Sequence, residues 1–176
     1  MREELKSERL ILRQLEMADA ERLVGLANNW NVARMLSRIP YPYSLAMAQE
    51  WIARTAAERA EGEEFVYAVT NGEGVVGTCG LQSHADGTHE IGYWIGEPWW
   101  NRGYASEAAR LVLDDAAACF GAATIVSGHF SDNHASGRVL TKLGFRYTGE
   151  EHRWCVARQQ RVHCLTMKLM RTDEVR

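Results

Sequence analysis

Apolar side chains recur at every third or fourth position in two stretches of the chain, residues 20–27 and 105–120, the spacing that gives a helix one buried face. In the second stretch, Ala105, Ala108, Val112 and Ala116 fall on one side. The expected helices span residues 19–29, 45–61, 104–120 and 133–143. Polar caps and glycines set their ends, with Asp19, Ser44 and either Asp132 or Asn133 as caps and Gly62, Gly121 and Gly144 as stops.

Shorter apolar runs predict strands over residues 10–15, 65–69, 75–81, 89–95, 124–130 and 162–169, with another strand starting at residues 145–148. Tight turns at 71–74 and 86–87 predict an antiparallel meander in the middle of the chain. The helix at 104–120 then bridges a parallel pair of strands. Residues 34–43, interrupted by Pro40 and Pro42, and residues 151–160 are expected to be irregular. This order of elements predicts a mixed α/β fold.

The length and net charge of the chain restrict the classes of protein to which it can belong. The 176 residues fit one domain over residues 1–176. The net charge of −3 argues against nucleic-acid binding through a global basic field. No apolar run approaches the roughly 20 residues of a membrane span, and the charged N-terminus lacks the apolar segment of a signal peptide. We therefore expect no nucleic acid, no membrane and a cytoplasmic location.

The cysteines predict neither disulfides nor a metal site. Cys79, Cys119, Cys155 and Cys164 form no CxxC pair and stand at no zinc-finger spacing from a histidine. We expect four reduced thiols that mostly fill the core, and no metal. The alternative is a catalytic cysteine, although neither Cys79 nor Cys119 has an obvious base near it in the sequence.

The most informative stretch lies where the strand at 89–95 gives way to the helix at 104–120. A helix start carries backbone N–H groups without internal partners and the positive end of the helix dipole, so it favours anions. Gly103 lets a bulky phosphate approach the backbone because it has no Cβ. The loop is neither GxxxxGK[ST] nor GxGxxG, which excludes a P-loop and a Rossmann dinucleotide site. It predicts a cradle for a pyrophosphate.

The run Trp-Trp-Asn-Arg-Gly-Tyr-Ala-Ser-Glu-Ala at 99–108 resembles motif A of the GNAT acetyltransferases, in which Gly103 and Ala105 match. Trp100 stands where Gln or Arg is usual, a departure similar to the ribosomal-protein N-acetyltransferase subgroup (the RimJ/RimL type). A second segment agrees: Asn133-x-x-Ser136 precedes Leu-Gly-Phe at 143–145, and residues 7–13 look like the opening strand of the subgroup. The resemblance covers residues 7–170.

The resemblance implies the GNAT fold, a central mixed sheet flanked by helices. Its parallel strand pair splays apart to admit the pantetheine arm of acetyl-CoA, and Gly92 or Gly96 is expected to mark a bulge there. It also implies a set of cofactor-binding residues: Trp94, Ile95, Trp100, Asn101, Arg102, Gly103, Tyr104, Ala105, Ser106, Asn133 and Ser136. Arg138 and Lys142 are within reach of the cofactor's phosphates or are simply solvated.

Acetyl transfer to an amine needs a neutral amine, a stabilised oxyanion and a proton for the departing thiolate. Glu90, at the head of the strand beside the thioester, is the first candidate base, against the alternative of a solvent-facing strand residue. His84, His89 and His152 are other candidates. Ser136 is the candidate proton donor, against the alternative of a residue that only helps to cap its helix.

The predicted function is direct transfer of the acetyl group of acetyl-CoA to a primary amine, with a protein N-terminal amine as one candidate acceptor. The segments 34–43 and 151–160 are expected to shape the acceptor pocket. The alternatives are a small-molecule amine, a longer acyl group such as succinyl, and a non-catalytic acyl-CoA sensor. The partners are acetyl-CoA and the amine acceptor, and the chain is expected to be a monomer or a homodimer.

Overall fold

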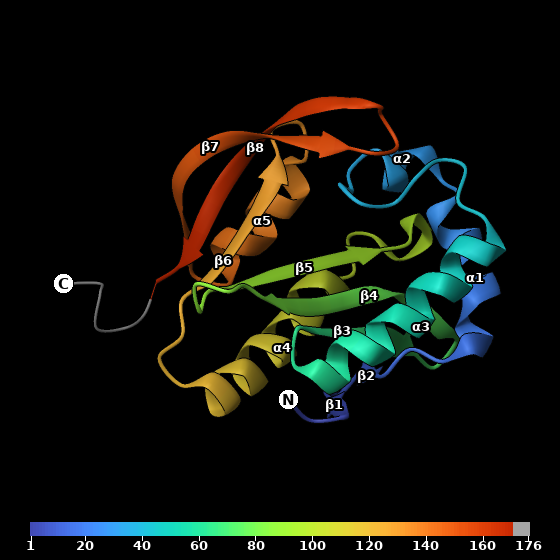
Figure 1. Cartoon of the computed structure of the whole chain (residues 1–176), viewed down its shortest axis with the longest axis horizontal. Coiled ribbons are helices and arrows are strands. Elements are labelled where there is room, and N and C mark those ends of the chain that lie inside the picture. Colours follow the sequence, from blue (N-terminus) through green and yellow to red (C-terminus); the bar gives the residue numbers. More distant parts are fainter. Residues whose placement is uncertain (171–176) are drawn as a thin grey trace.

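The computed structural model describes residues 1–170, so the last six residues of the predicted domain lie outside it. Eight strands form one sheet in the order β1-β2-β3-β4-β5-β6-β8-β7 (Figure 1). Among the described strands, β5 and β6 are the one parallel pair. The strands are β1 (Glu4–Lys6), β2 (Ile11–Arg13), β3 (Glu64–Asn71), β4 (Gly74–Ser83), β5 (His89–Ile95), β6 (Ile125–Phe130), β7 (Phe145–Cys155) and β8 (Gln160–Leu169).

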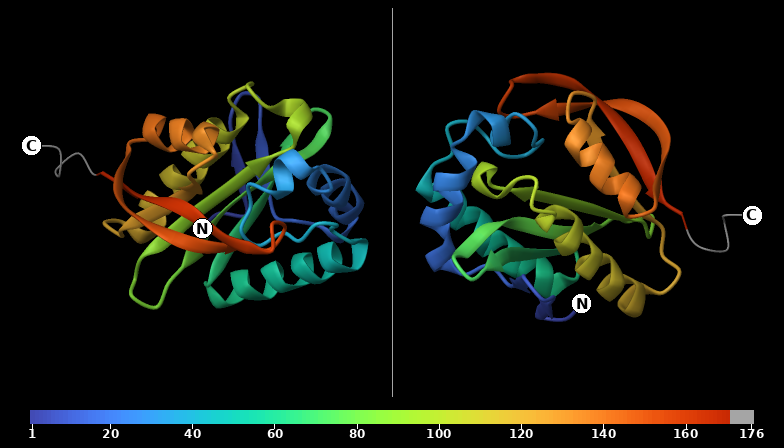
Figure 2. Two further views of the ribbon diagram at one scale, coloured as in Figure 1. Left: turned by 90° about the horizontal axis from the view of Figure 1, so that it is seen from above. Right: turned by 180° about the vertical axis from the view of Figure 1, so that it is seen from behind.

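Helices cover both faces of the sheet (Figure 2). One face carries α1 and α3, whose Leu23 and Ile52 join a core with Ala68 and Val75 of the sheet. The other face carries α4 and α5, and there Val112 of α4 lies in the larger core. The helices are α1 (Ala20–Ala27), α2 (Trp30–Ala33), α3 (Leu45–Glu61), α4 (Tyr104–Phe120) and α5 (His134–Lys142), with 3-10 turns η1 (Met17–Asp19) and η2 (Glu97–Trp99).

The two long helices begin and end where local chemistry predicts. The Ser44 hydroxyl accepts a hydrogen bond from the Met47 N–H at 3.2 Å, which caps α3, and Gly62 ends the helix with φ 78°. Gly103 and Gly121 bracket α4. The predicted mixed α/β fold is confirmed.

Asp19 does not cap α1 as expected. Its carboxylate accepts hydrogen bonds from both terminal nitrogens of Arg13, each at 2.8 Å, and from the Glu16 N–H at 2.8 Å. It therefore joins β2 to η1, and α1 starts without a side-chain cap and ends at Ala27.

The expectation of an irregular segment at 151–160 is wrong. β7 continues to Cys155 and pairs antiparallel with β8 over its whole length, with one register shift between Tyr147 and Gly149. The exposed polar residues of this strand give no apolar alternation, so its pairing with β8 decides its conformation. The short β1 and α2 were also not predicted.

The parallel pair is splayed. β5 and β6 keep register only at His89 opposite Ile125 and Glu90 opposite Val126, and the Ser127 hydroxyl donates to the Ile91 carbonyl at 2.8 Å. Beyond that point β6 pairs with β8 alone. The expected bulge is wrong, because β4 and β5 stay in register through Gly92, and Gly96 follows β5 as the residue before η2. Divergence of β6 makes the gap.

Candidate active site

The loop between β5 and α4 is fixed by its two tryptophans. Trp99 is buried, and the Arg22 guanidinium lies 5.1 Å from its ring centroid. Trp100 donates its indole N–H to the Ile95 carbonyl at 2.6 Å, so the loop folds back on the end of the strand. Asn101 (φ 60°) and Gly103 (φ 81°) are left-handed and turn the chain into the helix.

The N-terminus of α4 is open to a ligand. Its capping position is Gly103, which has no side chain to accept hydrogen bonds from the first-turn N–H groups. A Cβ on Gly103 would approach only Arg9, at 3.6 Å from Nη2, so the space before the helix is free. The residue types and the backbone fit a pyrophosphate group held by N–H donors.

One large cavity, of about 1220 Å³, begins at this helix start. The predicted cofactor residues that line it are Trp94, Ile95, Trp100, Asn101, Gly103, Tyr104, Ala105, Ser106, Asn133 and Ser136. Arg102 does not line it, and the Arg102 carbonyl accepts a hydrogen bond from Arg9 at 3.0 Å. The cavity continues past Gly92 of β5 and Gly128 of β6. The sheet is therefore open where β5 and β6 separate.

Two hydroxyl groups meet at this gap. The Tyr93 and Ser136 hydroxyl oxygens lie 3.0 Å apart, and Tyr93 also donates to the Ser136 carbonyl at 3.2 Å. Burial raises the pKa of Tyr93 above its usual range, so the phenol keeps its proton. The Asn133 carbonyl oxygen accepts a hydrogen bond from the Ser136 N–H at 3.2 Å, which leaves the Asn133 amide NH₂ without a partner among the described residues. Asn133 thus caps α5 and still has two donors to offer.

The sequence indicated Ser136 but not Tyr93 as a functional group. Strand alternation places Tyr93 on the opposite side of β5 from Trp94. This orientation of Tyr93 can be predicted from the sequence. Its contact with Ser136 of α5 cannot, because that contact depends on how the helix packs against the sheet.

Glu90 lies on the other side of the gap and is ion-paired. One oxygen pairs with the Arg153 guanidinium, and the other lies 3.6 Å from His84 Nε2. Arg153 also pairs with Glu151. Burial alone would lower the pKa of Arg153, but its hydrogen bonds to Glu90 and Glu151 outweigh burial and raise it. A Cβ on Gly128 would lie 3.1 Å from Cys164 Sγ and 3.2 Å from the Leu165 carbonyl oxygen, so β8 leaves little space for a side chain at this position of β6.

The candidate histidines His89 and His152 lie outside the cavity. His89 stacks on Phe120 at 4.3 Å between centroids and hydrogen-bonds Ser83 at 3.1 Å, and burial lowers its pKa. His152 faces His163 across the β7–β8 hairpin. Neither lines the cavity, and Glu90 does.

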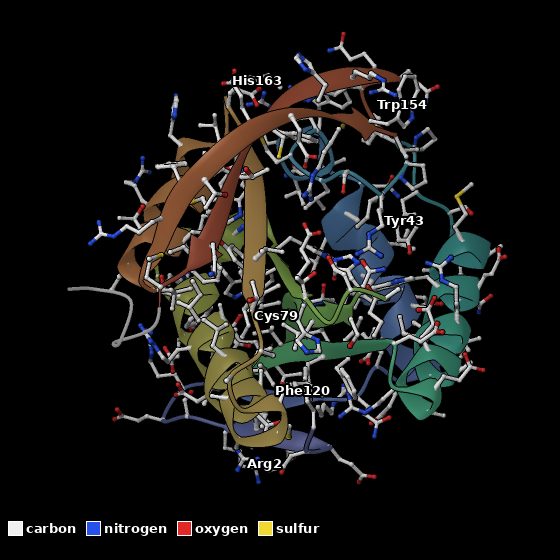
Figure 3. The ribbon with its side chains drawn as sticks, turned by 60° about the vertical axis from the view of Figure 1, so that its left-hand side comes forward. Arg2, Tyr43, Cys79, Phe120, Trp154 and His163 are labelled. Atoms are coloured by element: carbon white, nitrogen blue, oxygen red, sulfur yellow. The ribbon has the colours of Figure 1, made fainter. Side chains whose placement is uncertain are left out.

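The far end of the cavity is a charged bay. The segment at 34–43 lines it, together with Arg153 and Val156 of the segment at 151–160. Arg38 pairs with Glu64 at 3.1 Å and donates to Gln82 at 3.0 Å, and no pattern in the sequence indicates these contacts. In Figure 3, Tyr43 lies beside α1 and α3, and Trp154 lies near the tip of the hairpin.

The hairpin tip is tied to the segment after α2. The Val156 N–H donates to the Ser37 carbonyl at 3.0 Å, and Arg158 donates to the Arg34 carbonyl at 2.6 Å. Arg158 also pairs with Asp132 at 2.9 Å, and Arg34 pairs with the same carboxylate at 3.3 Å. Figure 1 shows the hairpin curving over towards α2, so these contacts close one side of the bay.

Residues 1–170 contain no group of three His, Cys, Asp or Glu side chains arranged to hold a metal ion. In that same range, no helix is long and apolar enough to cross a membrane. The four cysteines are free thiols, and three of them are buried.

Residues 9–146 match the acetyltransferase (GNAT) domain family. The chain is 32% identical over 159 residues to the uncharacterized N-acetyltransferase YoaA of Bacillus subtilis (strain 168), covering 82% of this chain and 84% of YoaA. It resembles in fold the microcin C7 self-immunity acetyltransferase MccE, solved with acetyl-CoA and AMP, at a TM-score of 0.81 and 16% identity over 92% of each chain. RimL, a ribosomal L7/L12 alpha-N-protein acetyltransferase solved with coenzyme A, gives a TM-score of 0.78 at 19% identity, over 93% of this chain and 97% of RimL. The chain belongs to the GNAT family and is an acyl-CoA-dependent acetyltransferase.

Proposed function

We propose that the protein transfers the acetyl group of acetyl-CoA directly to a primary amine, in the cytoplasm. One observation carries this proposal: a single cavity of about 1220 Å³ joins the open N-terminus of α4, the gap between β5 and β6, and the charged bay. A donor and an acceptor that enter from opposite ends would meet at the gap. Both solved relatives named above hold CoA or acetyl-CoA, which supports the same choice of donor.

Each group along the cavity has a proposed role. When bound, acetyl-CoA supplies an activated acyl group and a thiolate leaving group. The N–H groups at the start of α4 hold the pyrophosphate, and the free Asn133 amide donates to the pantetheine. Ser136, with Tyr93 at 3.0 Å, donates a proton at the sulfur. Glu90 accepts a proton from the amine, directly or through water.

We propose a polypeptide N-terminal amine as the acceptor. The resemblance to the ribosomal-protein subgroup and the alpha-N-protein acetyltransferase activity of RimL support this choice. The bay is also wide, since it extends from α3 residues Met47 and Trp51 to Val156 at the hairpin.

A small amine is the second candidate. The contacts of the hairpin tip with Ser37 and Arg34 close one side of the bay, and a closed bay favours a compact acceptor. The ion pair of Arg38 with Glu64 offers charges of both signs to such a molecule.

A thiol-release assay with acetyl-CoA distinguishes the two candidate acceptors, a polypeptide N-terminal amine and a small amine. The panel contains peptides with a free N-terminus, the same peptides with that amine blocked, free amino acids, polyamines and aminoglycosides. Turnover with free but not blocked peptides supports the first candidate, and turnover only with small amines supports the second. No thiol release above hydrolysis with any amine contradicts the transferase proposal and favours a sensor.

A further inference from the structure

The floor of the charged bay carries a row of polar side chains that runs across three strands. Glu64 of β3 lies opposite Gln82 of β4, and Gln82 lies opposite Glu90 of β5. Residues directly opposite each other on antiparallel strands point to the same face of the sheet, with Cβ atoms about 4.5–5.5 Å apart. All three residues line the large cavity. Gln82 is therefore the direct neighbour of the proposed base.

Arg38 fixes the orientation of the Gln82 amide. Its two terminal nitrogens donate to Glu64 at 3.1 Å and to the Gln82 side-chain oxygen at 3.0 Å. The Glu64 side chain is 10% exposed, so Arg38 is held by a carboxylate with little access to solvent. Because a guanidinium has donors only, the amide oxygen must face Arg38, which leaves the amide NH₂ for another partner.

The Gln82 amide NH₂ donates no hydrogen bond to any of residues 1–170. Its nitrogen is not one of the buried polar atoms without a partner, and Gln82 lines the cavity, so a bound molecule can reach it. The row therefore presents two kinds of group side by side. Gln82 offers two donors, and an ionised Glu90 offers acceptors alone.

Glycines leave space next to this row. Gly80 and Gly92 lie opposite each other, two residues along their strands from Gln82 and Glu90, and so on the same face. Both glycines line the cavity, and a Cβ on Gly92 would meet no atom within 4 Å. A ligand can therefore lie over β4 and β5 with one group at Glu90 and the adjacent group at Gln82.

We propose that Gln82 selects acceptors in which a carbonyl group follows the amine-bearing carbon, as in a peptide N-terminus or an amino-acid amide. The inference rests on the proposed acetyl transfer and names the substrate class of that same site. The amine needs a hydrogen-bond acceptor, which Glu90 supplies, and the carbonyl oxygen needs a donor, which the Gln82 amide supplies. Arg38 and Glu64 are positioning residues that act through Gln82. Polyamines and aminoglycosides carry no such carbonyl and are the poorer acceptors.

Acetyl transfer to matched pairs of amines tests this selection. Alanine amide is paired with isopropylamine, and trialanine is paired with its analogue that has an alkene in place of the first amide. The ratio of kcat/KM within each pair is compared between wild type and variant, so that the different basicities of the amines cancel. Gln82→Met is expected to lower the preference for the carbonyl-bearing amine about fivefold, the size of one lost neutral hydrogen bond.

Gln82→Glu is the second variant, because it keeps an oxygen for Arg38 and removes both N–H donors. It is expected to lower the preference at least as much as Gln82→Met does. Arg38→Met lets the amide rotate and is expected to lower the preference about twofold. Gln49→Met is the matched control and is expected to leave the preference unchanged, since Gln49 is an exposed glutamine of α3 outside the cavity.

If Gln82→Met and Gln82→Glu keep the wild-type preference, or lose activity equally with both members of a pair, selection by Gln82 is overturned and the transferase function stands. The same holds if the wild-type protein acetylates only amines without the carbonyl. If it acetylates no amine at all, the proposed function fails as well.

Discussion

The Tyr93 and Ser136 hydroxyls lie 3.0 Å apart where β5 and β6 separate, and one of them is expected to protonate the thiolate. We predict that Ser136→Ala lowers kcat about 10²-fold and changes KM for acetyl-CoA much less, because a proton donor acts in the transition state. Steady-state kinetics of Ser136→Ala and Tyr93→Phe measure this.

Tyr147→Phe is the control for these variants, since it removes a hydroxyl that lies 3.2 Å from His129 and does not line the cavity. If Ser136→Ala keeps the wild-type kcat and Tyr93→Phe has a lowered kcat, Tyr93 is the proton donor. Full activity of both would show that neither hydroxyl donates the proton.

Glu90 is expected to act as the base from within its ion pair with Arg153. We predict that Glu90→Gln lowers kcat/KM about 10²-fold at neutral pH. The loss should shrink as pH rises, because more of the amine is then already neutral. A pH–rate profile of the variant beside the wild type measures both effects.

Glu151→Gln separates catalysis from the positioning of Arg153, because Glu151 is the other carboxylate that pairs with this arginine. If Glu90 matters only by holding Arg153, the two variants will lose similar activity. A pH–rate profile of Glu90→Gln that matches the wild type would show that Glu90 is not the base and has only a structural role.

At the scale of elements, the ion pair of Asp19 with Arg13 ties β2 to η1. The Asp19 side chain is 8% exposed. Burial alone would raise its pKa, but hydrogen bonds from Arg13 and the Glu16 N–H outweigh burial and lower it. A lowered carboxylate pKa stabilises the fold above the unfolded pKa of about 3.9, and this stability is lost as pH falls through the folded pKa.

We predict that Asp19→Asn lowers the free energy of unfolding by about 1–3 kcal/mol at neutral pH. The difference from wild type should narrow below pH of about 4. Urea denaturation at several pH values measures it, with the exposed Asp114→Asn on α4 as the control. A difference that stays constant down to pH of about 3 would contradict this account.

Helix ends were predictable because their signals are local. Ser44 and Gly62 bound α3, and Gly103 and Gly121 bound α4. Asp19 differs from the expectation: a carboxylate before an apolar stretch is typical of a helix cap, but its partner Arg13 lies in β2. The strand at 145–155 was underestimated because its exposed face carries no alternation, and only pairing with β8 reveals it.

At the scale of the whole molecule, the cavity is built from segments far apart in the chain. The open start of α4, where we propose the pyrophosphate cradle, was predictable because it lies within one continuous run of sequence. The pairs Tyr93–Ser136, Glu90–Arg153 and Arg34–Asp132 were not, because each joins elements that only the sheet order and helix packing bring together. The side-chain pairs of the candidate site therefore follow from the tertiary structure, whereas the cofactor motif can be recognised within a single stretch of sequence.

The central claim is that the start of α4 holds the pyrophosphate of CoA, and Gly103→Val tests it most directly. Gly87→Val is the matched control, because Gly87 has the same φ of 81° but lies in the turn between β4 and β5, where an added Cβ would meet no atom within 4 Å. Both variants carry the same backbone strain, which thermal melts would register. We predict that calorimetry gives a CoA Kd at least about tenfold weaker for Gly103→Val, a loss of about 1.4 kcal/mol, and an unchanged Kd for Gly87→Val. A folded Gly103→Val protein that binds CoA as the control does would contradict the account.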